Sequence, residues 1–444
     1  MPGKEKDLLK MTKVLVHDWL MGTGKSSRMI DQINNSPSDQ RWIVVTPFLK
    51  ECHRYAGTVV DPDSEDRQLP KRDGNEVIYT GEGCSASGRR FVHPVSGHLS
   101  KVEHIAKLVH EGRDIVTTHA ALKLFTPETV KDVKDAGYRL VIDEELECIK
   151  PHPVKAHRRK MLLSSGAVYE DESGLLRWNE DFIIDDTKDV DSTGYSWDMQ
   201  IKALCDNGSL VLISDEKGNR DLFMWEYPIE FLKAFDQIDV LTYMFKGSVF
   251  EKYLDFYGIE HTTEMGTQLP SDPFRLIRLV DNDKMNRVGE REHIFSATDQ
   301  RTYTKESAVA KTVRANLENF FKNSTYGKST PNDRLWTCLD QTFPVFKGGG
   351  YTQRHIAQNT KAVNDYKDTF HLAYVYNSFL HPEPYKYLVD RGAQYAPDRD
   401  RYALSEMLQW VYRSRVRCDR EINLYVPSKR MRDLLIQWME GKIV

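Results

Sequence analysis

The chain has 444 residues, a formal net charge of −4, 40% hydrophobic residues and 29% charged residues. This length predicts two or three domains with ample core, and the composition excludes an intrinsically disordered chain. The slightly negative charge argues against a protein coated in nucleic acid, but it is compatible with one locally basic cleft.

Cysteine usage and hydropathy exclude other classes. The six cysteines show no CxxC pairing, which indicates reduced thiols rather than a disulfide framework or a zinc site. No apolar run approaches the ~18 residues of a membrane span, and the charged residues 2–6 do not resemble a secretory signal. We therefore expect a cytoplasmic protein (in the host cytoplasm if it is viral) that has no membrane partner.

The first predicted strand, Lys13–Val16, runs into a phosphate-binding loop and a helix from Ser26 to about Asn34. Small residues let backbone N–H groups approach phosphate oxygens, a lysine reaches the β- and γ-phosphates, and a serine hydroxyl ligates Mg²⁺. Trp19 stands where the usual pattern has its first glycine, so the alternative is an ordinary turn with a solvated lysine. The residues predicted to bind the nucleotide are Gly22, Thr23, Gly24, Lys25, Ser26 and Ser27.

Strands and helices alternate beyond this loop. A strand is predicted over Trp42–Val45, a helix over Lys101–Glu111 and a strand over Asp114–Thr118. Alternation of this kind predicts an α/β fold with a parallel sheet, which binds ligands at the carboxyl ends of its strands.

A second chemical motif follows the predicted strand Arg139–Ile142. Asp143 is predicted to hold Mg²⁺ together with Ser26, and Glu144 is placed to polarise the attacking water. Alone, the two acids also fit an ordinary acidic loop, and the next acid, Glu145, fits a solvated neighbour equally well. Combined with the upstream phosphate loop, they predict hydrolysis of a nucleoside triphosphate.

The composition changes between about residues 150 and 208, which we interpret as an insertion in the first domain. A basic patch at His157–Lys160 fits either a duplex contact or a solvated face. A hairpin is predicted from Ala167–Tyr169 and Leu175–Trp178 around Ser173-Gly174. An acidic stretch from Asp181 to Asp191 completes the insertion, and strands resume at Leu210–Ile213 and Val240–Thr242.

We expect the chain to leave the first domain in the segment near Lys246–Gln268, and we divide it into domains over residues 1–250 and 251–444. Strand-like runs return at Arg275–Ile277, Arg334–Cys338 and Ile422–Val426, and helices are predicted over Tyr402–Val416 and Lys429–Met439. The economical architecture is two α/β domains.

In a helix over 402–416, Gln409 and Arg413 share one face, which Arg417 continues, because residues four apart align. A guanidinium inserted from the second domain stabilises charge in phosphoryl transfer. A solvated basic face is the alternative. We expect Arg413 to supply this charge, with Arg417 the next candidate and Arg415 pointing elsewhere.

The order of these segments resembles that of DEAD/DEAH-like superfamily 2 helicases, and of helicase-like ATPases encoded by bacteriophages. The resemblance covers most of the chain outside the insertion. It implies two tandem RecA-like, P-loop NTPase domains with parallel sheets and an ATP- and Mg²⁺-dependent helicase or translocase. It also implies a role in phage replication or recombination, with DNA favoured over RNA as the partner. The segments that carry it are 22–26, 45–48, 116–119, 143–144, 240–245, 359–366 and 403–431.

The resemblance also implies roles for single residues. Two departures are that Tyr412 replaces a usual glycine and that the second arginine falls one position late. The residues implied to contact a nucleic-acid strand, or to couple it to hydrolysis, are Thr46, Pro47, Thr117, Thr118, His119, Thr242 and Asn359. The implied catalytic residues are Lys25, Asp143, Glu144, Gln409, Arg413 and Arg417.

Two other functions stay open. A DNA-packaging ATPase shares both nucleotide motifs, but such motors usually carry a C-terminal nuclease with clustered carboxylates, and the acids after Gly350 are dispersed. A loader that uses ATP as a conformational switch would bind nucleotide and a nucleic acid without strand-stimulated turnover. Replication proteins are the expected further partners.

Overall fold

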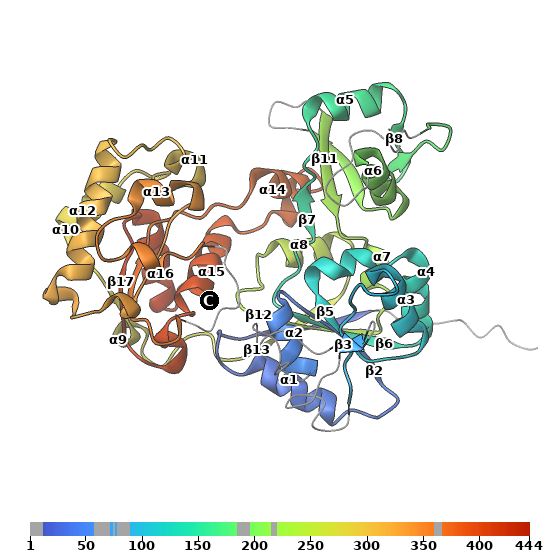
Figure 1. The fold of residues 1–444 in the computed structure, drawn as a ribbon, viewed down its shortest axis with the longest axis horizontal. Coiled ribbons are helices and arrows are strands. Elements are labelled where there is room, and N and C mark those ends of the chain that lie inside the picture. Colours follow the sequence, from blue (N-terminus) through green and yellow to red (C-terminus); the bar gives the residue numbers. More distant parts are fainter. Residues whose placement is uncertain are drawn as a thin grey trace, which may run out of the picture.

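The computed structural model describes residues 12–56, 72–73, 76–77, 89–183, 196–214, 220–358 and 366–444. They form two α/β lobes, with an insertion projecting from the first (Figure 1). The first lobe contains a six-stranded parallel sheet in the order β13-β1-β12-β6-β2-β5. Its strands are β1 (Lys13–Asp18), β2 (Arg41–Thr46), β5 (Ile115–Thr118), β6 (Tyr138–Asp143), β12 (Gln237–Thr242) and β13 (His261–Met265).

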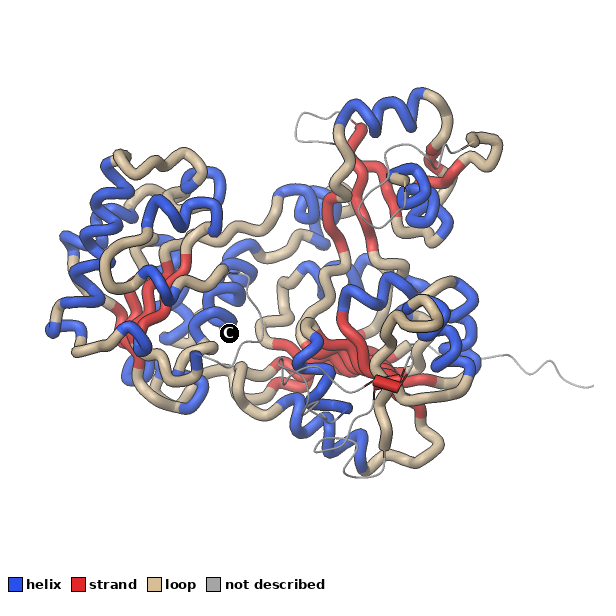
Figure 2. Tube along the Cα trace, in the orientation of Figure 1, coloured by secondary structure: helices blue, strands red, loops and turns tan. Residues whose placement is uncertain are grey.

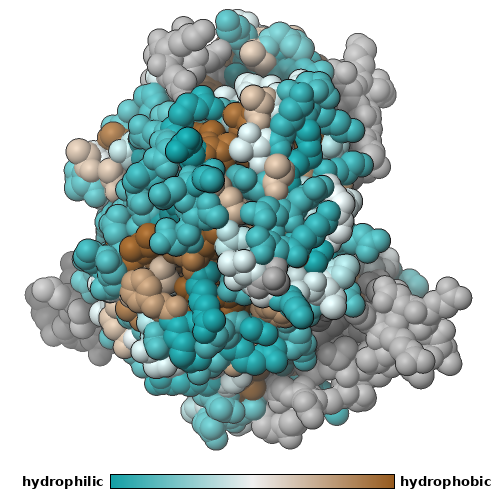
Figure 3. Space-filling model, turned by 90° about the vertical axis from the view of Figure 1, so that its left-hand side faces the viewer, coloured by the Kyte–Doolittle hydropathy of each residue, from teal (hydrophilic) through white to brown (hydrophobic). Residues whose placement is uncertain are grey.

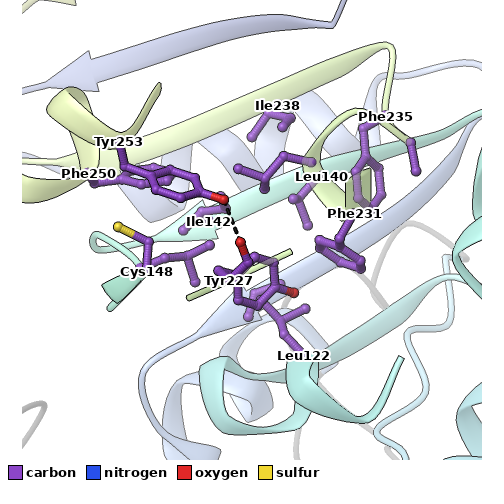
Figure 4. Close-up of a cluster of buried hydrophobic side chains, with 14 of the residues drawn as sticks. Leu122, Leu140, Ile142, Cys148, Tyr227, Phe231, Phe235, Ile238, Phe250 and Tyr253 are labelled. Atoms are coloured by element: carbon purple, nitrogen blue, oxygen red, sulfur yellow. Dashed lines mark hydrogen bonds between the residues drawn. The ribbon is translucent and has the colours of Figure 1, made fainter. Parts of the chain in front are cut away.

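Helices cover both faces of this sheet, as a sheet with near-continuous apolar strands requires. In Figure 4, Leu140 and Ile142 of β6 and Ile238 of β12 lie against Phe231 and Phe235 on one face. The α-helices of the first lobe are α1 (Lys25–Asn34), α2 (Leu49–Ala56), α3 (Lys101–His110), α4 (Pro127–Asp135), α7 (Ile229–Leu232) and α8 (Val249–Phe256), and the 3-10 helix η2 spans His119–Leu124.

The register of the sheet brings three strand ends to one edge. Asp18 of β1 is level with Thr242 of β12, and Leu241 of β12 is level with Asp143 of β6. Parallel strands present their carboxyl ends together, so the loops after β1, β6 and β12 meet there. The strands and helices expected over residues 13–46 and 101–143 are present, and each begins and ends within two residues of the expected position. The largest difference is at β1, which continues to Asp18.

The insertion has its own antiparallel sheet, in the order β10-β11-β7, and the predicted hairpin is present as β8 and β9. It extends past residue 208, because Leu210–Ser214 pairs within this small sheet instead of rejoining the main one. A short apolar run does not reveal which sheet it joins. The elements of the insertion are β7 (Ile149–Pro151), α5 (Ala156–Ser164), β8 (Val168–Glu170), β9 (Leu176–Trp178), α6 (Trp197–Asp206), β10 (Leu210–Ser214) and β11 (Arg220–Glu226).

The first lobe continues beyond the predicted boundary at residue 250. That position falls inside α8, and β13 then pairs with β1 as an edge strand of the main sheet. A polar strand such as His261–Met265 lacks the apolar run that marked the other strands, and only its pairing shows where it belongs.

The second lobe has a four-stranded parallel sheet in the order β14-β17-β16-β15. Sequence reasoning missed β16, a strand of only four residues that begins with a histidine, whereas the helix over 429–439 is present as α16. Figure 2 shows these strands enclosed by helices, and Figure 3 shows that most of the outer face is hydrophilic. The strands are β14 (Ile277–Leu279), β15 (Arg334–Thr337), β16 (His371–Tyr374) and β17 (Ile422–Tyr425). The α-helices are α9 (Pro273–Leu276), α10 (Asp283–Asn286), α11 (Ala297–Gln300), α12 (Ala308–Lys322), α13 (Phe343–Phe346), α14 (Pro382–Val389), α15 (Arg399–Val411) and α16 (Lys429–Met439).

One helix of the second half packs into the first lobe. Tyr387 and Leu388 of α14 are fully buried members of the first-lobe core, and α14 contacts α8 and β7 (Figure 1). Glu226, buried at the end of β11, accepts hydrogen bonds from the hydroxyls of Tyr387 and Tyr257. The two lobes are therefore tied together at the base of the insertion. Among the described residues, no helix combines the length and apolarity that a bilayer crossing requires.

Candidate nucleotide site

The turn between β1 and α1 has the backbone of a phosphate-binding loop. Gly22 and Gly24 adopt left-handed conformations with φ of 82° and 88°, which other L-residues rarely adopt. Gly24 is also the N-cap of α1, so the unpaired N–H groups of the first helical turn face the loop. An anion is favoured at such a helix N-terminus.

Trp19 explains how the loop forms without its first glycine. Its indole N–H donates to the Glu264 carbonyl oxygen at 3.0 Å, and the Arg28 guanidinium lies 4.7 Å above the ring. Gly266 makes room for the indole, since a Cβ there would lie 2.2 Å from Trp19 Cδ1. Trp19 therefore fixes the start of the loop to the edge strand β13.

Lys25 is folded onto this loop. Its Nζ donates to the carbonyl oxygens of Trp19 and, at 3.4 Å, Leu20. Burial lowers the pKa of Lys25 to about 8, although Asp143 and Asp18 oppose the shift. Phosphate oxygens would supply the negative charge that this partly desolvated ammonium lacks.

Ser26 and Asp143 form the candidate metal site. The Ser26 hydroxyl donates to Asp143 Oδ2 at 3.2 Å, from the first turn of α1 to the end of β6. Burial, with repulsion from Glu144 and Glu51, raises the pKa of the Asp143 carboxyl to about 7. A hydroxyl and a carboxylate are the hard oxygen ligands that Mg²⁺ takes, and a cation at this position would restore the charged form. The donor set fits the ion.

Glu144 follows Asp143 in a strained turn, which a backbone hydrogen bond to β12 holds in place. It adopts a left-handed conformation with φ of 62°, and its N–H donates to the Leu241 carbonyl oxygen at 2.9 Å. Met244, beyond β12, also has φ of 62°, and its N–H donates to Asp18 Oδ1 at 2.8 Å. Left-handed non-glycine residues cost free energy and often occur at functional sites. Glu144 and Met244 are two such residues, and they lie just beyond the carboxyl ends of β6 and β12.

A cavity of about 320 Å³ opens at these strand ends, and both lobes line it. The predicted helix over 402–416 is wrong in its C-terminal part, because α15 ends at Val411 and a 3-10 helix, η10, covers Arg415–Cys418. Gln409 lines the cavity from α15 itself, whereas Arg413 reaches it from the turn after this helix and Arg417 from η10. The second-lobe residues lining it are Gln409, Tyr412, Arg413 and Arg417.

Arg413 enters the cavity as a buried cation. Burial lowers the pKa of its guanidinium, while the charges of Glu144 and Glu406 raise it. Its Nη1 has no hydrogen-bond partner. A buried guanidinium with an unsatisfied N–H costs free energy that an anionic oxygen in the cavity would recover.

Arg417 lies directly on the phosphate-binding loop. A Cβ added to Gly22 would lie 2.8 Å from Arg417 Cγ, so only glycine fits at this contact. The Arg417 charge also helps to lower the pKa of Lys25. Arg415 points elsewhere, as expected, with its guanidinium 4.3 Å above the Phe370 ring.

The residues predicted to contact a nucleic-acid strand are dispersed. Thr46 and Thr117 are fully buried, and the Thr46 hydroxyl donates to the Phe48 carbonyl oxygen at 2.9 Å. Thr118 is partly exposed, and the neighbouring His119 ring lies 3.0 Å from the Asp143 carbonyl oxygen. Pro47 and Thr242 line the nucleotide cavity itself, and Asn359 lies outside the described residues.

Sequence reasoning missed two residues of α2. Glu51 and Arg54 line the cavity, and Arg54 Nη2 donates to the Ser27 hydroxyl at 2.6 Å. Isolated charges on an amphipathic helix look like an ordinary solvated face. The one available signal is that α2 begins just after the carboxyl end of β2.

The remaining loop hydroxyl, that of Thr23, donates to the Leu20 carbonyl oxygen at 2.7 Å.

Comparison with known proteins gives two results. Residues 272–439 match the YonV C-terminal Rossmann-like domain, which agrees with the parallel sheet of the second lobe. The whole chain is similar to the SPbeta prophage-derived uncharacterized protein YonV of Bacillus subtilis (strain 168), with 27% identity over 451 residues, covering 97% of this chain and 100% of the relative. The chain is thus an α/β protein with parallel sheets and a Rossmann-like C-terminal domain, distantly related to a prophage-derived protein.

Proposed function

We propose that this chain is an ATP-dependent nucleic-acid helicase or translocase whose two lobes are RecA-like P-loop NTPase domains. The observation that carries the proposal is the cavity where Lys25 and Asp143 of the first lobe meet Arg413 of the second. A site completed by both lobes changes when they move, which couples hydrolysis to domain motion.

Each group has a role in the proposed reaction. The glycine N–H groups and Lys25 would hold the β- and γ-phosphates. Ser26 and Asp143 would hold Mg²⁺, which would supply positive charge against the phosphate oxygens. Glu144 orients the attacking water and takes up its proton. Arg413 stabilises charge developing on the transferred phosphoryl group, and Arg417, against Gly22, adds charge nearer the loop.

The nucleic-acid partner rests on the sequence resemblance and on the prophage origin of the relative. DNA in phage replication or recombination is the proposed setting, with replication proteins as further partners in the host cytoplasm. Thr118 and His119 keep partial exposure at the end of β5, so they are the better strand-contact candidates. Thr46 and Thr117 are buried, so they would act indirectly, by packing beneath the residues that contact the strand.

Turnover of ATP with and without single-stranded DNA, duplex DNA and RNA tests the proposal. We expect a weak basal rate that DNA increases and that Lys25→Ala abolishes. Lys107→Ala is the matched control, since Lys107 is an exposed lysine whose partner, Glu111, lies on the surface of α3. Hydrolysis at the normal rate by Lys25→Ala would contradict the site, and hydrolysis that no nucleic acid stimulates would contradict the motor.

One observation favours a second function, an ATP-switched loader. Tyr387 and Leu388 are embedded in the first-lobe core, which restricts how far the lobes separate. A loader would bind ATP and a nucleic acid with slow turnover that the strand does not stimulate. The packaging alternative has less support, because no cluster of metal-ligating side chains lies in the described part of the second lobe.

A further inference from the structure

A second cavity, of about 490 Å³, lies where the insertion meets the first lobe. Leu122, Phe125 and Phe231 of the first lobe form one wall, and Leu175 and Leu204 of the insertion form the other. Figure 4 shows Leu122 and Phe231 at the border of the first-lobe core. The cavity is separate from the nucleotide site and has the size and apolar lining of a small-molecule site.

The acidic side chains that line this cavity are already neutralised. Asp206 lies 3.4 Å from Lys202, and Glu230 lies 2.9 Å from Lys233. The third acid, Glu226, accepts hydrogen bonds from two tyrosine hydroxyls. None of the three needs a cation from a ligand.

The basic side chains are not balanced in the same way. Arg177 has Asp171 at 2.7 Å, but Lys123 has no carboxylate of the described residues within ion-pair distance. Instead, Lys123 Nζ lies 4.1 Å from the centre of the Trp225 ring, which Lys150 also approaches at 5.5 Å.

Lys123 therefore shares an indole with another cation. Partial desolvation and the neighbouring Lys150 lower the pKa of Lys123 to about 8, and burial together with the same two lysines lowers the pKa of His152 to about 4. The His152 Nε2 has no hydrogen-bond partner. Glu147, 2.6 Å from Lys150, is the carboxylate paired with this group. The local excess of positive charge lies at the rim of an apolar cavity.

We propose that this cavity binds a small amphipathic anion, with an apolar or aromatic body between the two walls and a carboxylate on Lys123. The apolar body would displace water from the walls, and the carboxylate would form an ion pair with Lys123, which is exposed at the rim. This inference does not depend on the proposed nucleotide chemistry.

The test compares two ligands that differ only in the head group, 4-phenylbutyrate and 4-phenylbutan-1-ol, by calorimetric titration of the full chain. We expect saturable binding with one site and about a threefold preference for the acid, since an ion pair with an exposed lysine contributes a modest part of the affinity. Lys123→Met keeps the apolar stem, so it should bind the alcohol normally and lose the preference. Lys107→Met, which alters an exposed lysine of α3 whose partner Glu111 also lies outside the lining, is the control and should keep it.

A filling variant tests the cavity separately. Val130 lines the cavity on α4 and is only partly buried, so Val130→Phe should reduce the space with little damage to the core. We expect it to weaken both ligands at least tenfold while circular dichroism stays unchanged. Equal affinities of the normal chain for acid and alcohol, an acid preference that survives Lys123→Met, or full binding by Val130→Phe would each overturn the proposal.

Discussion

The two lobes contribute to the candidate nucleotide cavity in different ways. The first lobe supplies loops at adjacent strand ends, where the phosphate-binding loop and Asp143 follow directly from β1 and β6. The second lobe supplies Arg413 and Arg417 from a turn after α15 that no periodicity predicts. The site residues of the first lobe can therefore be predicted from the sequence, whereas the contribution of the second lobe depends on how the chain packs across the cavity.

Replacing Lys25 tests the contribution of the first lobe, for which we expect the largest effect. Lys25→Ala removes the one lysine folded onto the loop, so we expect loss of detectable ATP turnover. Equilibrium binding of a fluorescent ATP analogue should weaken in parallel, since Lys25 reaches the phosphates in the ground state too. Unchanged nucleotide affinity would show that the loop does not hold the triphosphate.

Replacing the arginine across the cavity tests the other half. Arg413→Ala should lower kcat about 10³-fold, a typical effect of losing an arginine that stabilises phosphoryl transfer, while ATP affinity changes less. Arg415→Ala, two residues away, is the matched control, because its guanidinium lies over Phe370 instead of in the cavity. Equal losses in the two variants would indicate damage to the turn and not to catalysis.

Glu144→Gln separates binding from hydrolysis within the first lobe. The amide keeps the shape of the side chain in its left-handed turn but cannot accept the proton of the attacking water, so we expect kcat to fall about 10²-fold or more. Rapid filtration should recover bound, unhydrolysed ATP. Normal turnover would show that another group orients the water.

Much of the first lobe was predictable because its strands are apolar runs followed by recognisable loops. Packing decided the rest. The polar strand β13 belongs to the main sheet, and Leu210–Ser214 belongs to the insertion, because of partners distant in sequence. Arg413 was identified on the assumption of a continuous helix, but it reaches the cavity through a turn. Glu51 and Arg54 carry no motif at all.

The tie between the lobes gives a smaller, structural effect. Tyr387→Phe removes one of two hydroxyls that donate to the buried Glu226 carboxylate, so we expect the free energy of unfolding to fall by about 1–3 kcal/mol. Tyr385→Phe is the control on the same helix, since the Tyr385 ring lies under Arg399 and keeps that contact. Equal stability of the two variants in urea would mean that α14 is held by apolar packing alone.

A pH dependence is the last expected effect, and it is confined to the candidate metal site of the first lobe. Because the pKa of Asp143 is raised to about 7 in the folded protein, its stabilising contribution is complete below the unfolded value near 3.8 and is lost as the pH rises through about 7. Without Mg²⁺, the free energy of unfolding should therefore decline between about pH 4 and pH 7 more steeply than in Asp143→Asn, which lacks this titration. Mg²⁺ binds the deprotonated form, so it should oppose the decline, and each pH unit below 7 should weaken its binding about tenfold. Urea unfolding at four pH values, with and without Mg²⁺, measures both effects. Parallel pH profiles of the two proteins would show that Asp143 is not the titrating group, and the charge balance of the cavity would then depend on its second-lobe arginines.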